Sequence, residues 1–284
     1  PPRRPGRCSA AGRWAGRPLR SACCWTLTEL VLQYWPFGGF QWLRLGYTMV
    51  DSPLAGFYPF TGAASVTFFV ALIGHLLARA VLNRTGRDAL VAAAATIGVL
   101  LAGWAGTRWS PDAASTGTVP VGYVQGGAPG GGIYGLGPAR SIAYAHASET
   151  RNLMGRVRAG ELPKPAFIAW PENSTDVDPF LDAETNSIVR AAVAAADLPI
   201  LVGGITQGPD DGERQTVALW WTTDNQVPVR YIKRNIVPFG EWIPLRELLL
   251  PLIPLLQYVG DQSVPGTAPG ALPVTLGNGE KLTL

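Results

Sequence analysis

Two charged side chains flank a stiff turn in the second half of the chain. The strand-like run 227–232 leads directly to Lys233, and the Pro-Phe-Gly turn at 238–240 presents Glu241. Opposite charges on a strand end and a rigid turn are held in place better than they would be on a flexible loop. A fixed ammonium and a fixed carboxylate suit the stabilisation and transfer of charge at a reacting group. On spacing alone, two surface charges beside a turn remain the simpler interpretation, because short motifs often match by chance.

A third charged residue follows a strand further upstream. Residues 166–170, Ala-Phe-Ile-Ala-Trp, predict a buried strand, which Pro171 ends immediately before Glu172. The carboxyl ends of strands are where α/β folds place their reactive groups. Glu172 could equally cap the next element, but together with Lys233 it forms a candidate acid/base pair.

These residues must be positioned by an α/β domain, which we expect over residues 119–284. Apolar and alternating runs predict strands at 119–125, 166–170, 199–205, 217–222 and 227–232, and helices at 141–159 and 182–195. His146 is interpreted as a surface or helix-packing residue, and residues 274–284 predict a hairpin around a Gly-Asn-Gly turn. The glycine-rich stretch 126–137 lacks phosphate-binding spacing and is interpreted as a plain loop. The apolar, proline-broken stretch 248–259 predicts either a lid that dips toward lipid or a segment packed under the domain.

Residues 25–109 have the composition of a membrane region. The runs 60–82 and 89–106 are nearly uncharged and about as long as the ~20 residues that a bilayer requires. The preceding segment, 25–49, is rich in Trp, Tyr and Phe, which favour the membrane interface, and its Trp-Pro-Phe-Gly-Gly turn breaks any helix. Two buried helices of a soluble protein are the alternative, which the length and low charge of the runs disfavour. His75, in the first run, is interpreted as a polar residue tolerated at a helix contact.

Positive charge predicts how the two spans are oriented. Arg79, Arg84 and Arg87 flank the short connection between them, so the positive-inside rule places that connection in the cytoplasm. A polar linker at 110–118 and the α/β domain after it are then expected on the outer face of the cell membrane.

Composition excludes some classes of function. The formal net charge is +3, and the scattered Lys and Arg residues form no clustered basic face, so nucleic acid is not an expected partner. The exception is residues 1–24, which contain Arg but no acid and predict a basic, disordered arm near a membrane surface. Cys8, Cys23 and Cys24 are too few and too clustered for a disulfide framework or a zinc site.

The chain resembles the apolipoprotein N-acyltransferase family, the membrane-bound branch of the nitrilase superfamily, in two stretches. The first is Trp170-Pro171-Glu172, and the second is Tyr231, Lys233 and the Val-Pro-Phe-Gly-Glu string at 237–241. The string is typical of that branch, whereas the Pro-Glu pair and the Lys belong to the whole superfamily. The resemblance covers about residues 25–284. It implies an α/β fold, a nitrilase-like α-β-β-α sandwich truncated at its C-terminus and preceded by transmembrane α-helices.

For the parent enzyme the resemblance implies a two-step acyl transfer. A cysteine thiolate takes an acyl chain from a phospholipid as a thioester, and the chain then passes to the N-terminal amine of a diacylglyceryl-cysteine lipoprotein. Glu172 is implied as the general base, Lys233 as the cation that stabilises the oxyanion, and Glu241 as a carboxylate that orients Lys233 or the nucleophile. The implied partners are the phospholipid donor, the lipoprotein acceptor and the membrane, with no cofactor and no metal.

The nucleophile is not among these residues. The resemblance predicts it just after the strand that ends at Leu284, whereas Cys8, Cys23 and Cys24 precede both spans and match no part of the motif. The sequence also does not begin with Met, so we expect a fragment that has no acyl-transfer activity by itself. Two rival hypotheses remain open: a membrane-tethered amidase or nitrilase acting on a small amide, and a non-catalytic remnant or binding module.

Overall fold

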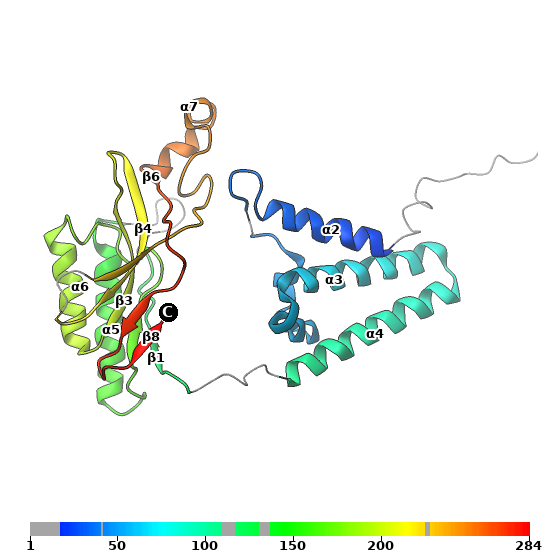
Figure 1. Cartoon of the computed structure of the whole chain (residues 1–284), viewed down its shortest axis with the longest axis horizontal. Coiled ribbons are helices and arrows are strands. Elements are labelled where there is room, and N and C mark those ends of the chain that lie inside the picture. The colour runs from blue at the N-terminus through cyan, green and yellow to red at the C-terminus, as the bar shows by residue number, and fades with distance from the viewer. Residues whose placement is uncertain (1–17, 41, 110–116, 131–136, 225–227) are drawn as a thin grey trace, which may run out of the picture. The chain divides into compact units, whose positions relative to one another are not determined.

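A computed structural model describes residues 18–40, 42–109, 117–130, 137–224 and 228–284. The chain divides into two compact units, Pro1–Thr116 and Gly117–Leu284, which are described separately below (Figure 1). The division falls within the linker predicted at 110–118, of which residues 110–116 lie outside the described part.

The described part of the first unit is helical. The α-helices are α2 (Pro18–Leu32), α3 (Tyr58–Asn83) and α4 (Gly86–Arg108), with the 3₁₀ turns η1 (Leu45–Met49) and η2 (Pro53–Phe57) between α2 and α3. A short connection joins α3 to α4, and α2 packs beside α3 (Figure 1). Two segments are long and apolar enough to cross a membrane, by length and composition: Pro53–Asn83 and Gly86–Arg108. They contain the two predicted spans. Only 17% and 11% of the residues in their 18-residue apolar windows are buried within the structure.

Helix α2 corrects the predicted basic arm at 1–24, because residues 18–24 are helical. The helix carries only one basic and one acidic residue, and Pro18 suits a first helical turn, where its missing N–H is not needed. The prediction is therefore wrong for residues 18–24, and residues 1–17 lie outside the described part. The predicted break at Trp35–Pro36 is confirmed: α2 ends at Leu32, and Gly39 N–H donates back to the Pro36 carbonyl in the turn.

Glu29, which the sequence reasoning overlooked, links three elements of this unit. Its carboxylate accepts hydrogen bonds from Trp25 Nε1 (2.9 Å), from the backbone N–H of Leu45 (3.1 Å) and from Thr67 Oγ1 (2.7 Å). Acidic side chains in apolar helical regions are costly unless their oxygens find donors. Glu29 thereby ties η1 between α2 and α3.

Two glycines of α4 allow a close backbone contact with η2. A Cβ at Gly103 would lie 2.4 Å from the Pro53 carbonyl oxygen, and one at Gly106 would lie 2.5 Å from the Gly56 oxygen. Small residues let backbones approach in this way where apolar helices pack together. Turn η2 is thus pressed directly onto α4.

The second unit is a mixed α/β domain built on one six-stranded sheet. Its strands are β1 (Val121–Tyr123), β2 (Phe167–Ala169), β3 (Ile200–Gln207), β4 (Glu213–Trp221), β5 (Val229–Ile232) and β6 (Gln262–Ser263). The order is β1-β2-β3-β4-β5, with β6 paired to β4. Strands β1 to β3 are parallel, and β3, β4 and β5 are antiparallel in succession. The five strands predicted from the sequence are all present, although β4 begins at Glu213 rather than at 217.

Two apolar layers cover the sheet. Helices α5 (Ser141–Arg158) and α6 (Ala183–Ala196), both predicted, pack on one face around Ile168, Ile200 and Trp221 (Figure 1). On the other face the predicted hairpin, β7 (Pro273–Thr275) and β8 (Lys281–Thr283), packs against Phe167 and Trp220. The domain therefore has helices on one side of its main sheet and a two-stranded sheet on the other.

His146 is part of the helix-covered core, so its interpretation as a packing residue is confirmed and the surface alternative is wrong. The side chain is 2% exposed, and its ring lies 5.6 Å from that of Trp170. Nδ1 pairs with the Ile142 carbonyl, whereas the buried Nε2 has no hydrogen-bond partner among the residues that the structure describes. Burial lowers the pKa of His146 below its ordinary value, against a smaller opposite effect of the Ile142 hydrogen bond.

We therefore expect this domain to lose stability as the pH falls below the ordinary histidine value of 6.5. The unfolded chain binds a proton near that pH and the folded chain only at lower pH, so stability is full above it and declines below it. The slope is at most about 1.4 kcal/mol per pH unit for one group. Urea unfolding followed by tryptophan fluorescence between about pH 7.5 and 5.5 measures this slope, and H146L should flatten it. An equally steep slope in H146L would contradict the assignment.

Candidate active site

Glu172 and Lys233 follow strands that run in the same direction. Strand β2 is parallel to β3, and β5 is also parallel to β3 because two antiparallel pairings separate them. Glu172 comes three residues after the last paired residue of β2, and Lys233 directly follows β5, with its N–H bonded to the Thr216 carbonyl of β4 (2.9 Å). The carboxyl ends of β2 and β5 therefore lie at the same end of the sheet, as predicted, and both residues are located there.

The structure brings all three predicted site residues together. Lys233 Nζ lies 2.7 Å from Glu172 Oε1 and 3.0 Å from Glu241 Oε2. It also donates to Glu241 Oε1 at 3.1 Å. We call Glu172, Lys233 and Glu241 the Glu–Lys–Glu cluster. One ammonium is thus held between two carboxylates. The sequence indicated that Glu172 and Lys233 follow strand ends, but it gave no direct sign of these contacts.

Glu241 is the best anchored member of the cluster. Its side chain is 13% exposed, and Oε2 accepts the backbone N–H of Val237 at 2.6 Å. Oε1 accepts Thr216 Oγ1 at 3.1 Å. Thr216 was missed in the sequence because it precedes the predicted strand 217–222 and carries no signal of its own. These contacts fix the carboxylate from the turn and from β4, so Glu241 acts as a rigid support for the ammonium.

The turn that carries Glu241 is tightly closed. The N–H of Glu241 donates to the Val237 carbonyl at 2.9 Å, and the N–H of Phe239 donates to the Trp242 carbonyl at 2.7 Å. Phe239 has φ +64°, a left-handed conformation that is unfavourable for an aromatic residue. Such strain persists only where the surroundings impose it, and it is common at functional sites. The stiff turn predicted at 238–240 is therefore confirmed.

Glu172 differs from its partners because its side chain is 55% exposed, against 27% for Lys233. It occupies a short turn in which the next residue, Asn173, has φ +56°. An exposed carboxylate next to a fixed cation can reach a reactant and exchange a proton with it. The cluster thus has one open carboxylate and one buried carboxylate around the same ammonium.

Electrostatics keep Lys233 protonated. Partial burial by itself lowers the pKa of Lys233, but the hydrogen bonds and charges of Glu172 and Glu241 outweigh it, and the net result is a raised pKa. Lys233 is therefore a permanent cation at neutral pH. A preorganised cation of this kind can stabilise negative charge that develops on an oxygen.

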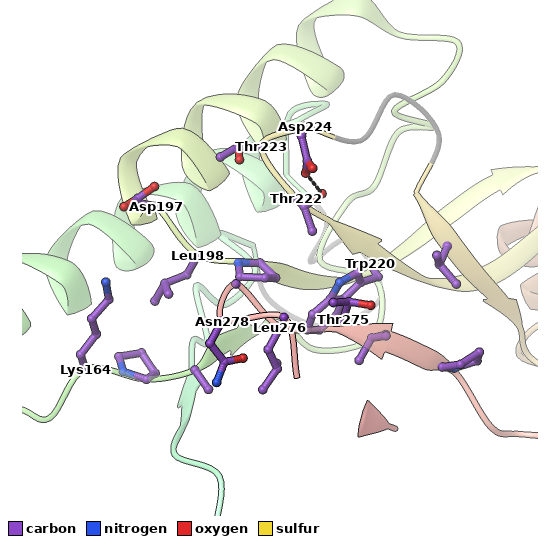
Figure 2. Close-up of a pocket in the computed structure, with 18 residues that line it drawn as sticks. Lys164, Asp197, Leu198, Trp220, Thr222, Thr223, Asp224, Thr275, Leu276 and Asn278 are labelled. Atoms are coloured by element: carbon purple, nitrogen blue, oxygen red, sulfur yellow. Dashed lines mark hydrogen bonds between the residues drawn. The ribbon is translucent and has the colours of Figure 1, made fainter. Parts of the chain in front are cut away.

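The cluster lies over the sheet face opposite the helices. On β4, Val217 faces the helix-covered core, so the neighbouring Thr216, which contacts Glu241, faces the other way. A pocket of about 940 Å³ lies on the same domain, and Figure 2 shows the side chains that line it. Two of them, Pro165 and Pro199, precede β2 and β3, so the pocket lies at the opposite end of the sheet from the cluster. Its lining includes Lys164, Trp220 and Asp224 and none of the cluster residues. We assign it no part in the cluster's chemistry.

The segment after the cluster exposes apolar side chains. It comprises α7 (Arg246–Leu249) and η5 (Pro254–Val259), and its exposed residues are Leu245, Leu248, Leu252, Ile253, Leu255 and Tyr258. Leu256 is the buried exception. The alternative of a segment packed under the domain is therefore wrong for most of these side chains, whereas the lid alternative stays a prediction.

Comparison with known proteins gives consistent matches. A family model described as "Apolipoprotein N-acyltransferase N-terminal domain" matches residues 6–76. The protein named apolipoprotein N-acyltransferase in Mycolicibacterium smegmatis is 34% identical over 247 aligned residues, covering 80% of this chain and 41% of the relative. Proteins of the same name in Methylococcus capsulatus and Haemophilus influenzae are 30% and 29% identical, covering 82% and 81% of this chain and 44% of each relative.

The chain is thus related to the apolipoprotein N-acyltransferases over about four-fifths of its length, and the resemblance in the sequence is confirmed, although the match begins at residue 6 rather than at about residue 25. It spans about two-fifths of the length of these curated relatives.

Proposed function

We propose that this chain carries the acid/base and oxyanion-stabilising part of an apolipoprotein N-acyltransferase. The observation that supports this most directly is the ammonium of Lys233 held at 2.7 Å from Glu172 and 3.0 Å from Glu241. The helices on one face of the main sheet and the β7–β8 hairpin on the other are compatible with a nitrilase-like α-β-β-α sandwich. We propose that architecture for residues 119–284.

The roles of the three residues follow from their surroundings. The exposed carboxylate of Glu172 takes the proton of the nucleophilic thiol, which attacks the ester carbonyl of a phospholipid. Lys233 stabilises the oxyanion of the tetrahedral intermediate, and Glu172 returns the proton to the departing alcohol oxygen of the lysophospholipid. The acceptor's N-terminal amine then attacks the thioester and Glu172 takes a proton from this amine. As the amide forms and the carbon–sulfur bond breaks, Glu172 gives this proton to the departing sulfur, which regenerates the thiol. Glu241 touches no reactant in this scheme and keeps Lys233 in position.

The membrane unit fits substrates that are themselves embedded in lipid. The two candidate spans support a location in the cell membrane, and the arginines at the connection of α3 and α4 favour an outward-facing α/β domain. The exposed apolar segment around α7 and η5 is suited to contact lipid near the site. Both proposed substrates, a phospholipid donor and a lipoprotein acceptor, are anchored in the membrane surface that this segment would contact.

The two rival hypotheses explain less. A tethered amidase would share Glu172 and Lys233, but its soluble substrate gives no reason for the membrane unit or for the exposed apolar segment. A non-catalytic remnant gives no reason for a charged cluster in which each carboxylate oxygen of Glu241 has a donor. The names of the relatives also favour acyl transfer over amide hydrolysis.

Replacing Glu172 with Gln in the full-length parent tests the proposal. Gln keeps the shape of the side chain but cannot take a proton, so we expect N-acylation to fall about 10²–10⁴-fold, the usual contribution of a general base. The measurement is complementation of a strain that lacks lipoprotein N-acylation, with mass spectrometry of a lipoprotein N-terminus. The matched control is E149Q, an exposed Glu on α5 of the same domain. Unchanged N-acylation in E172Q would overturn the proposed role.

A further inference from the structure

The carboxylate of Glu172 depends on a backbone contact between two strands. The carbonyl oxygen of Gly203, on β3, accepts the backbone N–H of Ser174 at 2.7 Å and the Ser174 hydroxyl at 2.6 Å. It is also 3.3 Å from the N–H of Thr175, within hydrogen-bond range. Ser174 and Thr175 are fully buried. One carbonyl of β3 therefore holds the turn that begins at Glu172.

Gly203 also lacks the atom that would push this turn away. A Cβ built at Gly203 would lie 2.3 Å from the carbonyl oxygen of Pro171 and 2.8 Å from the Cα of Glu172. Both are backbone atoms, which cannot rotate aside as the end of a flexible side chain can. Any side chain at this position must therefore displace the backbone of Glu172 or that of β3.

We propose that Gly203 is a positioning residue for Glu172. Its bare α-carbon lets the 171–172 backbone lie directly on β3, and its carbonyl fixes the turn there. The consequence for catalysis rests on the proposed function, whereas the effect on the contact between Glu172 and Lys233 does not.

The span of the sheet explains why this contact is sensitive. Glu172 follows β2 and Lys233 follows β5, with β3 and β4 between them. The Glu172 backbone lies directly against β3, and from there the Glu172 carboxylate reaches Lys233 at 2.7 Å. A displacement of about 1 Å at such a site can cost on the order of 10²-fold in rate.

The neighbouring glycine provides a matched control. A Cβ at Gly204 would meet the Thr175 hydroxyl oxygen at 2.5 Å, and no backbone atom of Glu172 is among its nearest neighbours. The two glycines are adjacent on β3, so their side chains would point to opposite faces of the sheet. G203A and G204A thus differ in whether the added methyl group meets the Glu172 backbone.

The test measures the reactivity of the Lys233 amine in the full chain in detergent, without any acyl donor. The chain contains three lysines, so exposed Lys164 and Lys281 serve as internal references for competitive labelling with acetic anhydride at alkaline pH. Only the unprotonated amine reacts, and each unit by which the pKa of Lys233 falls raises its reactivity roughly tenfold. Loss of the Glu172 contact removes one cause of the raised pKa of Lys233. We therefore expect Lys233 to label several-fold faster in G203A, approaching E172Q, and to change less in G204A, whose methyl group meets a side-chain oxygen rather than the Glu172 backbone.

A Lys233 labelling rate in folded G203A equal to that of wild type would overturn the proposal. If G203A fails to fold, S174A decides instead, because it removes the hydroxyl donor and leaves the backbone contacts. A labelling increase at Lys233 in S174A supports the proposal, and no increase overturns it. Because this readout needs no acyl transfer, failure of the proposed activity in the E172Q experiment would leave its result standing.

Discussion

Replacing Lys233 with Met in the full-length parent is expected to lower N-acylation by about 10²–10³-fold, the usual cost of removing one oxyanion-stabilising group. Met retains the apolar stem of Lys but not the charge. Without the ammonium, Glu172 and Glu241 face each other across the site with no cation between them. Glu241, which is 13% exposed, then becomes a largely buried carboxylate without an ion-pair partner, so a loss of stability is also expected.

The measurement therefore combines N-acylation with a thermal unfolding curve of each purified variant. K281M, an exposed lysine on β8 of the same domain, controls for the general loss of one positive charge. K233R adds a second test, because the longer planar guanidinium keeps the charge but cannot reproduce a point donor between two carboxylates. Rates in K233M close to those in K281M would show that the cation has no part in the reaction.

The strand ends that carry Glu172 and Lys233 were predictable because their signals are local. An apolar run stopped by Pro171 predicts the end of β2, and the run 227–232 predicts β5 before Lys233. Both strands are present with nearly the predicted bounds. The long apolar helices α3 and α4 were predictable for the same reason, since a long uncharged run needs no distant partner to be recognised.

The parts that the sequence did not predict depend on distant partners. Strand β4 starts at Glu213 because the polar residues before 217 pair with β3 on one side and with β6 on the other. Thr216 matters because it meets Glu241, and Gly203 matters because it meets the Pro171–Glu172 backbone. The contact between the turn after residue 170 and the strand around residue 203 could not be predicted, because nothing in either local sequence indicates it.

The same distinction applies to the two carboxylates. The sequence motif contains both Glu172 and Glu241 and does not distinguish their environments. Only the structure shows that Glu172 is exposed and that Glu241 is held by several hydrogen bonds. Glu172 is more than half exposed, and the hydrogen bond it receives comes from Lys233. Glu241 is held by Thr216, Val237 and Lys233. A group that must accept and release a proton needs the first environment, whereas a group that orients a cation needs the second.

Replacing Glu241 with Gln is therefore expected to weaken the site without removing its base. Gln can still accept the Val237 N–H through its carbonyl oxygen, but it no longer offers a charged partner to Lys233. Hydrogen bonds to charged groups contribute about 1.5–3 kcal/mol, so we expect N-acylation to fall roughly 10- to 100-fold, less than in E172Q.

Lys233 itself reports the change in E241Q. Loss of the Glu241 charge removes one of the contacts that raise the pKa of Lys233, so its labelling by acetic anhydride should accelerate relative to Lys164 and Lys281. E247Q, an exposed Glu on α7 a few residues further along, should change neither quantity. If E241Q instead lost as much activity as E172Q while Lys233 labelled at the wild-type rate, Glu241 would act on the reactants directly. Its assignment as a support for the cation would then be wrong.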